Sequence, residues 1–256
     1  MLLTNLIKYT TNGQIRLMKH KHCIIVIIFF VLGSFCPSFA QQTVITIPSS
    51  DVLPFGHMIL KQSNRFSPFG DGFVSLTPNM TFGTGKDTEV SFGVGTSIRD
   101  RTDVKLDMTA KKVFRIKKRT RLTIGGRLQP SLTAGEKPDS MVYAHTSFLV
   151  KKTRTTLTAG TYVAGYSQMP DSTGVMLGID QAIIPNKLRV VADWMSRQDS
   201  GCALAAGVKY RPVPTTSVTT AVVIPNDSED RIAFSISLSQ YLGRVLPEKK
   251  KDEEEL

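Results

Sequence analysis

The sequence is poor in cysteine, with three in 256 residues, and two of these, Cys23 and Cys36, lie within the first 40 residues. The third is Cys202, so residues 41–256 can form neither an internal disulfide nor a cysteine-based metal site. Histidine and carboxylate residues show no metal-ligand spacing, and no metal or cofactor is predicted. The formal net charge of +11 is not accompanied by arginines interleaved with aromatic residues. The charge alone therefore does not indicate a nucleic-acid partner.

The apolar run Cys23–Gly33 is too short for a transmembrane helix, which needs about 20 residues. It follows the charged segment Met18–His22 and precedes Ser38 and Ala40, the small residues that a cleavage site before Gln41 requires. This pattern is typical of a secretory signal peptide. We predict that residues 1–40 are a cleaved signal peptide that directs export through the inner membrane, with Met18 as an alternative start.

Helical periodicity longer than a turn or two is absent from residue 55 onward. The chain instead repeats segments of about ten alternating residues followed by turn residues, which predicts an all-β fold. In Arg231–Tyr241, for example, large apolar residues alternate with alanine and serine, so a strand there would have one apolar and one small polar face. About twelve such strands are predicted within residues 55–242. They follow a periplasmic lead-in at 41–54 and precede a charged, disordered tail at 243–256.

Two all-β architectures fit these strands. A secreted soluble β-sandwich, with a binding or structural role, would turn its apolar faces inward and cover its outer faces with lysine and glutamate. The polar faces here are rich in serine, threonine and glycine, and the predicted strands exceed the usual five or six residues. We therefore favour a twelve-stranded, antiparallel, up-and-down transmembrane β-barrel with its apolar faces outward.

The leader SFCPSFA, the lead-in IPSSDVLPFGH and the hairpin series that ends in RIAFSISLSQY resemble bacterial outer-membrane β-barrel proteins, in particular porin-like barrels. The resemblance implies a place in the bacterial outer membrane, contact with its lipid and insertion by the barrel-assembly machinery. It also implies a passive pore or small-solute transporter.

Charged residues of both signs fall on the predicted polar faces, where they could pair across a lumen. A slight excess of cations there would favour small polar or anionic solutes. The predicted lumen-lining residues are Lys61, Glu89, Lys105, Asp107, Arg127, Asp180, Arg189, Asp193 and Lys209.

His145 and Ser147 lie two residues apart, hence on one face of a strand, where an imidazole could activate a hydroxyl. Outer-membrane phospholipase A and lipid A deacylases are similar in using a His-x-Ser pair, so an outer-membrane acyl hydrolase is the alternative function. Phe148 stands where those families commonly have asparagine, and no third residue is evident that would orient the histidine. The pair also faces the predicted lumen rather than lipid. The porin-like interpretation assigns no catalytic residue.

Overall fold

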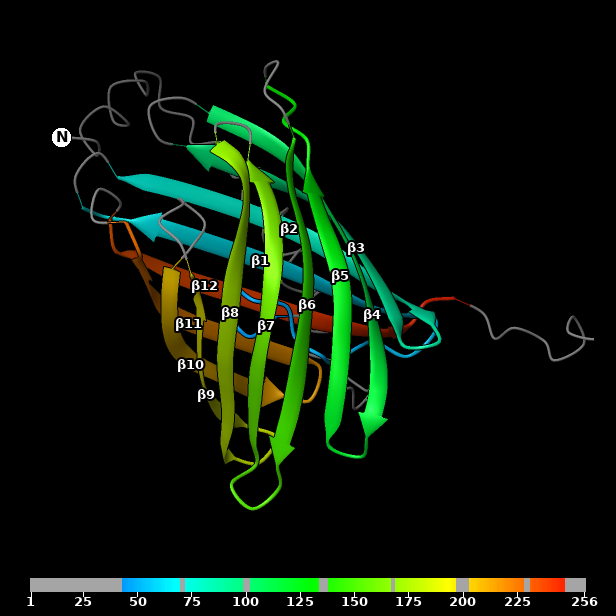
Figure 1. The fold of residues 1–256 in the computed structure, drawn as a ribbon. Coiled ribbons are helices and arrows are strands. Elements are labelled where there is room, and N and C mark those ends of the chain that lie inside the picture. The colour runs from blue at the N-terminus through cyan, green and yellow to red at the C-terminus, as the bar shows by residue number, and fades with distance from the viewer. Residues whose placement is uncertain are drawn as a thin grey trace, which may run out of the picture. The chain divides into compact units, whose positions relative to one another are not determined.

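The structure, a computed structural model, describes residues 43–69, 72–98, 102–133, 138–166, 169–196, 203–227 and 231–246. Twelve antiparallel strands form one closed barrel (Figure 1), which confirms the predicted fold class. None of the described residues forms a helix long and apolar enough to cross a bilayer. The strands are β1 (His57–Ser67), β2 (Phe73–Gly85), β3 (Thr88–Ile98), β4 (Thr102–Lys117), β5 (Thr120–Gln129), β6 (Asp139–Val150), β7 (Thr155–Tyr166), β8 (Met169–Ile184), β9 (Leu188–Met195), β10 (Ala203–Val213), β11 (Thr216–Pro225) and β12 (Ala233–Arg244).

The barrel closes where β12 pairs with β1, with Tyr241 opposite Ile59 and Phe234 opposite Phe66. Every strand thus has two hydrogen-bonded neighbours, and no edge is left to pair with another chain. Strand β1 begins at His57 rather than at residue 55, because Gly56 adopts a left-handed φ of 75° that turns the chain into the strand.

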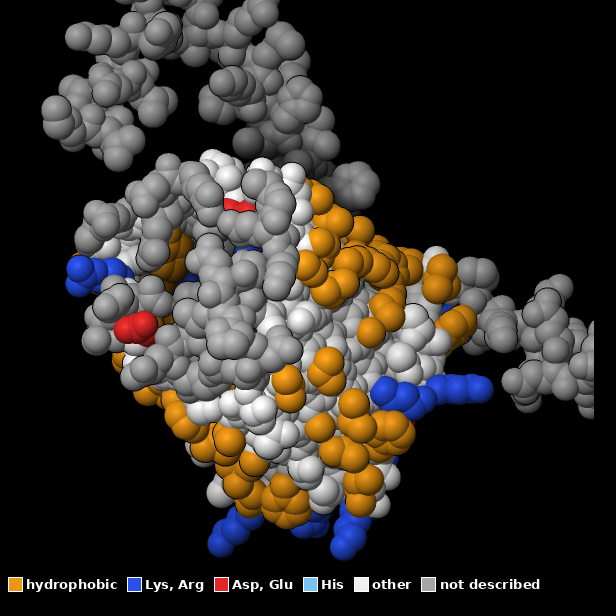
Figure 2. Space-filling model, turned by 45° about the horizontal axis from the view of Figure 1, so that its top comes forward, with side chains coloured by type: hydrophobic (Ala, Val, Ile, Leu, Met, Phe, Trp, Pro, Cys, Tyr) orange, Lys and Arg blue, Asp and Glu red, His pale blue; other side chains and the backbone are white. Residues whose placement is uncertain are grey.

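The outer wall is apolar along its length, and the burial is the inverse of that in a soluble protein. In β12, the outward-facing Ile236 is 44% exposed, whereas the inward-facing Ala233 is 2% exposed. Figure 2 shows apolar side chains spread over the outer wall and basic side chains at the lower rim. The secreted β-sandwich interpretation is wrong, because the apolar faces point outward from a single closed sheet.

The two ends of the barrel differ. At the end where β1 starts, which we call the turn end, consecutive strands are joined by tight turns that contain Lys86, Asp87, Arg154 and Asn186, all with positive φ. At the opposite end, which we call the loop end, the connections β5–β6 and β9–β10 are longer. The tight turns also carry Lys118 and Arg119, so the turn end has a basic rim.

Residues 43–54, which we call the lead-in, lie inside the barrel (Figure 1). The periplasmic position predicted for this segment is therefore replaced by a luminal one. The physical reason is that inward-facing side chains supply hydrogen-bond partners for its backbone and an apolar surface for Val44, Ile47 and Leu53, which are all buried. The signal peptide predicted at 1–40 and most of the predicted tail, residues 247–256, lie outside the described residues.

Candidate functional site

The buried carboxylate of Asp193, on β9, holds the first half of the lead-in. Its Oδ2 accepts hydrogen bonds from the backbone N–H groups of Ile45 (2.6 Å), Thr46 (2.8 Å) and Ile47 (3.2 Å), and its Oδ1 accepts one from the Thr46 hydroxyl (2.6 Å). The Asp193 carboxylate thus accepts hydrogen bonds from the backbone N–H groups of a tight turn. The turn is closed by a hydrogen bond of 2.9 Å from Val44 N–H to Ile47 O. Asp193 was predicted to line the lumen, and in the structure it binds the chain's own lead-in.

A buried ion pair between Glu89 on β3 and Lys111 on β4 holds the second half. Their charged atoms are 3.2 Å apart, and the side chains are 4% and 6% exposed. Glu89 also accepts the Leu53 N–H at 3.0 Å, and Lys111 donates to the carbonyls of Ser49 (3.1 Å) and Asp51 (2.7 Å). The pair therefore has partners for its remaining donors and acceptors, which a buried pair needs if it is to be tolerated.

The Ser50 hydroxyl lies at the centre of a polar cluster. It is 2.7 Å from the Thr123 hydroxyl, 2.8 Å from the Ser147 hydroxyl and 3.1 Å from His145 Nε2. Within the described contacts, His145 and Ser147 form no hydrogen bond to each other, because Ser50 lies between them. Arg121 adds hydrogen bonds to the Ser50 carbonyl and to Asp51.

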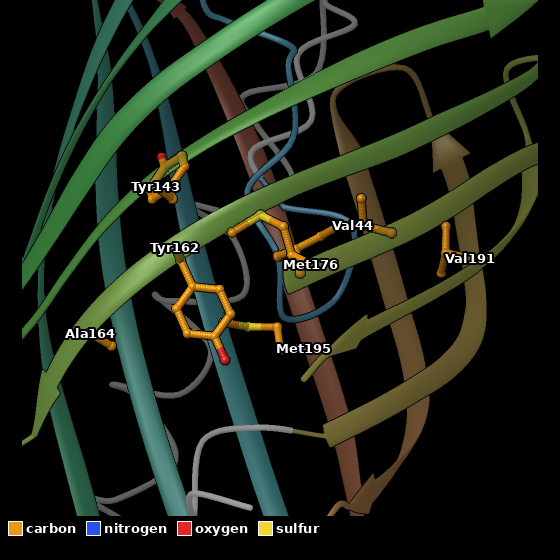
Figure 3. Packing of buried hydrophobic residues seen from close by; sticks show 8 residues of the cluster. Val44, Tyr143, Tyr162, Ala164, Met176, Val191 and Met195 are labelled. Carbon is orange, nitrogen blue, oxygen red and sulfur yellow. The ribbon is translucent and has the colours of Figure 1, made fainter. Parts of the chain in front are cut away.

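Part of the inner wall is apolar and receives the lead-in's own apolar side chains. Figure 3 shows Val44 beside Met176 of β8, with Tyr162 and Met195 nearby. Ile47 is completely buried in the same cluster. The cluster comprises Val44, Ile47, Tyr143, Tyr162, Ala164, Met176, Val191 and Met195.

Two inward-facing glycines make room for the lead-in. A Cβ on Gly83 would lie 2.0 Å from the Pro54 carbonyl oxygen, and one on Gly178 would lie 2.6 Å from Ile47 Cδ1. Neither distance is compatible with a side chain, so the lead-in occupies the space that a residue other than glycine would fill at these two positions.

Gly83→Ala is expected to destabilise the barrel by about 1–3 kcal/mol, the usual cost of overpacking, because the new methyl group meets backbone rather than a flexible side chain. The matched control is Gly95→Ala, since a Cβ there has its nearest neighbour at 3.7 Å. The stability of both variants is measured by urea unfolding in detergent. The signal is the loss of the heat-modifiable gel band. Equal stabilities of the two would contradict the luminal position of the lead-in.

The wall formed by β10, β11, β12 and β1, which we call the hydroxyl wall, contacts the lead-in at its two ends, where Ile45 packs against the alanines of β10 and β12 and Leu53 packs against Ile59 and Tyr241. Its inner face carries Ser217, Thr219, Ser235, Ser237 and Ser239. The described part of the chain encloses a loop-end chamber of about 420 Å³, a turn-end chamber of about 220 Å³, and a gap of about 30 Å³ between the lead-in and the hydroxyl wall.

The gap shares lining residues with both chambers. Lys61 and Thr43 line the gap and the loop-end chamber, and Val44 lines the gap and the turn-end chamber. Lys209, in the gap, is directly opposite Arg189 of the turn-end chamber in the pairing of β10 with β9. The gap therefore lies between the two chambers.

Most predicted luminal charges form ion pairs along the wall. Bidentate hydrogen bonds of 2.9 and 2.7 Å join Arg127 to Asp107, and Arg189 is 2.5 Å from Asp180. Lys105 pairs with Asp139 at 2.7 Å. The structure places the predicted residues as follows: Lys61, Glu89, Asp107 and Arg127 line the loop-end chamber, Asp180 and Arg189 the turn-end chamber, Lys61 and Lys209 the gap, while Asp193 binds the lead-in and Lys105 pairs with Asp103 and Asp139.

Sequence reasoning missed Ser50, Thr123, Arg121 and Lys111 as residues of the site. The alternation did place Lys111 on a polar face, but it could not show that its partners are carbonyls of a segment outside the strands. Glycines at inward positions, such as Gly83 and Gly178, were the available signal that something approaches the inner wall closely.

No family model matches the chain, and no curated protein is matched in sequence. Among solved structures, the chain is similar to KdgM porin, with a TM-score of 0.53 and 10% identity over 71% of this chain and 98% of that one. It is also similar to the COG4313 outer membrane channel from Pseudomonas putida F1, with a TM-score of 0.51 and 11% identity over 75% of this chain and 98% of that one. The chain has the fold of outer-membrane porins and channels.

Proposed function

We propose that this protein is a bacterial outer-membrane pore for small polar solutes, with a lumen narrowed by its own lead-in. The observation that carries this proposal is the inverted burial: apolar side chains cover the outside, and ion pairs and chambers lie within. An apolar outer wall suits a lipid bilayer, and a closed barrel leaves no unpaired backbone in it. KdgM porin and the COG4313 channel share this architecture, which is consistent with the proposal.

The proposal includes the route to the membrane and the partners there. The signal peptide at 1–40 carries the chain through the inner membrane, and the barrel-assembly machinery inserts it. Outer-membrane lipid then contacts the apolar wall.

The balance of luminal charge supports anionic over cationic solutes. Each of the carboxylates Glu89, Asp107 and Asp180 has a basic partner. Lys61 and Arg65, in contrast, form no ion pair with any carboxylate in the described part of the chain, although both line the loop-end chamber. An excess of unpaired cations raises the local concentration of anions.

The acyl-hydrolase alternative receives no support from the geometry. A Ser–His nucleophile needs a direct hydrogen bond between the two side chains, and Ser50 takes that place for both His145 and Ser147. Both side chains are almost completely buried inside the barrel, at 1% and 4% exposure. They hold the lead-in rather than face lipid.

Purified protein in a planar bilayer is expected to give discrete current steps in KCl, because the gap lies between the two chambers and shares lining residues with both. The steps are expected to be small, since the gap of about 30 Å³ has room for about two water molecules. Absence of current from the wild type and from variants with a released lead-in would overturn the pore function.

A further inference from the structure

We infer that the gap between the lead-in and the hydroxyl wall is an anion-binding constriction whose charge selectivity is set by Lys61 and Lys209. The ligand class is a small anion such as chloride, which would bind between the lead-in and β10–β12. This inference rests on the proposed pore function, and it assigns the site at which that pore selects its solutes.

Most of the lining of the gap is polar. Six of its eleven residues carry a hydroxyl, two are lysines, three are apolar, and none of those described is acidic. The hydroxyl groups can each donate one hydrogen bond, so they can replace water around an anion. The lining residues are Thr43, Val44, Ile45, Ile59, Lys61, Lys209, Ser217, Thr219, Ser235, Ser237 and Ser239.

The two lysines differ from the other luminal lysines in having no carboxylate partner. Lys61 Nζ donates to the Thr43 hydroxyl at 2.8 Å, and Lys209, which is 8% exposed, has no hydrogen bond or ion pair with any described residue. Lys105 and Lys111, in contrast, each pair with a carboxylate. The positive charge in the gap is therefore available to a ligand.

Nearby carboxylates form no ion pair with these lysines among the described residues. Asp180 is paired with Arg189, and Asp193, which keeps its negative charge, accepts four hydrogen bonds from neutral groups of the lead-in. Across the pairing of β10 with β9, the direct neighbour of Lys209 is Arg189, whose charge is balanced by Asp180. A cation that enters the gap thus meets like charges, whereas an anion meets two ammonium groups and several hydroxyl donors.

The lead-in is a necessary part of this site. Thr43, Val44 and Ile45 form one side of the gap, and without them Lys61 and Lys209 would face an open lumen in which water screens their charge. The lead-in therefore makes two wall lysines into a selectivity-determining pair.

The test is the reversal potential of single channels across a KCl gradient, with chloride as the probe anion. Wild type is expected to be anion-selective. Lys61→Gln and Lys209→Gln are each expected to move the reversal potential toward zero, and the double variant is expected to move it further. The control is Lys112→Gln, which removes a lysine from the outer face of β4, where its Nζ lies over the Phe114 ring; its reversal potential is expected to equal that of wild type.

The outcomes separate this inference from the proposed function. Current with a reversal potential that is unchanged in the double Lys61→Gln, Lys209→Gln variant would overturn the inference and leave the pore intact. Absence of current in wild type and in Asp193→Ala would overturn the pore itself. The heat-modifiable gel band shows whether the glutamine variants fold. If they do not, the test uses the double variant Lys61→Arg, Lys209→Arg, which keeps both charges and must retain the wild-type reversal potential.

Discussion

Asp193→Ala is expected to raise the single-channel conductance severalfold, because it releases residues 43–48 from the inner wall. The carboxylate accepts four hydrogen bonds from the lead-in at 2.6–3.2 Å. Hydrogen bonds to a charged group contribute about 1.5–3 kcal/mol each. Even a loss of roughly 4 kcal/mol shifts the equilibrium between docked and released lead-in by about a thousandfold.

The second half of the lead-in is expected to stay in place in this variant, since Lys111, Arg121 and Glu89 still bind residues 49–53. The barrel therefore keeps its fold while the gap widens into the two chambers. Planar-bilayer recording measures the conductance. Release of the lead-in is measured separately, by substituting Thr43 with cysteine in a variant that lacks Cys202. A water-soluble maleimide is expected to label this cysteine faster once the lead-in is released.

The matched control is Asp180→Ala, which removes a buried luminal carboxylate of the same charge that binds Arg189 and not the lead-in. Its conductance is expected to stay near that of wild type. An equal rise in both variants would mean that the loss of negative charge, rather than the release of the lead-in, is responsible.

Lys111→Met is expected to cost about 3–5 kcal/mol of stability, the typical effect of breaking a buried ion pair from one side. The change leaves Glu89, which is 4% exposed, as an unpaired buried carboxylate, and it leaves the carbonyls of Ser49 and Asp51 without their ammonium donor. Urea unfolding in detergent, followed by the heat-modifiable gel band, measures the loss.

Two further variants isolate the cause. Glu89→Gln combined with Lys111→Met is expected to recover part of the stability, because the double variant no longer buries an unpaired charge. Lys112→Met changes the next residue on the outward face of the same strand and is expected to stay within about 0.5 kcal/mol of wild type. A single Lys111→Met variant as stable as Lys112→Met would contradict the buried pair.

The alternation in the sequence was sufficient to predict the barrel, because a period of two assigns each side chain to the inner or outer face without knowledge of its neighbours. It placed Ile236 outside and Ser235 inside, and it predicted that the last strand pairs with the first, which the pairing of β12 with β1 confirms.

The lead-in could not be predicted in the same way. Its conformation has no period, and it depends on side chains from separate strands, with Asp193, Lys111 and Thr123 each far from residues 43–54 in the sequence. The alternation also placed His145 and Ser147 on one inward face. It could not show that Ser50 lies between them, because that contact joins residues 95 and 97 positions apart.

The luminal lead-in has a consequence for the order of assembly. It directly precedes β1, and β1 forms the closing seam with β12, the last strand to be synthesised. The ring of strands must therefore close around the segment that precedes its first strand, with Asp193 and the Glu89–Lys111 pair already engaged or free to engage from within. Residues 43–54 are therefore expected to be within the ring, or to enter it, by the time that β12 pairs with β1.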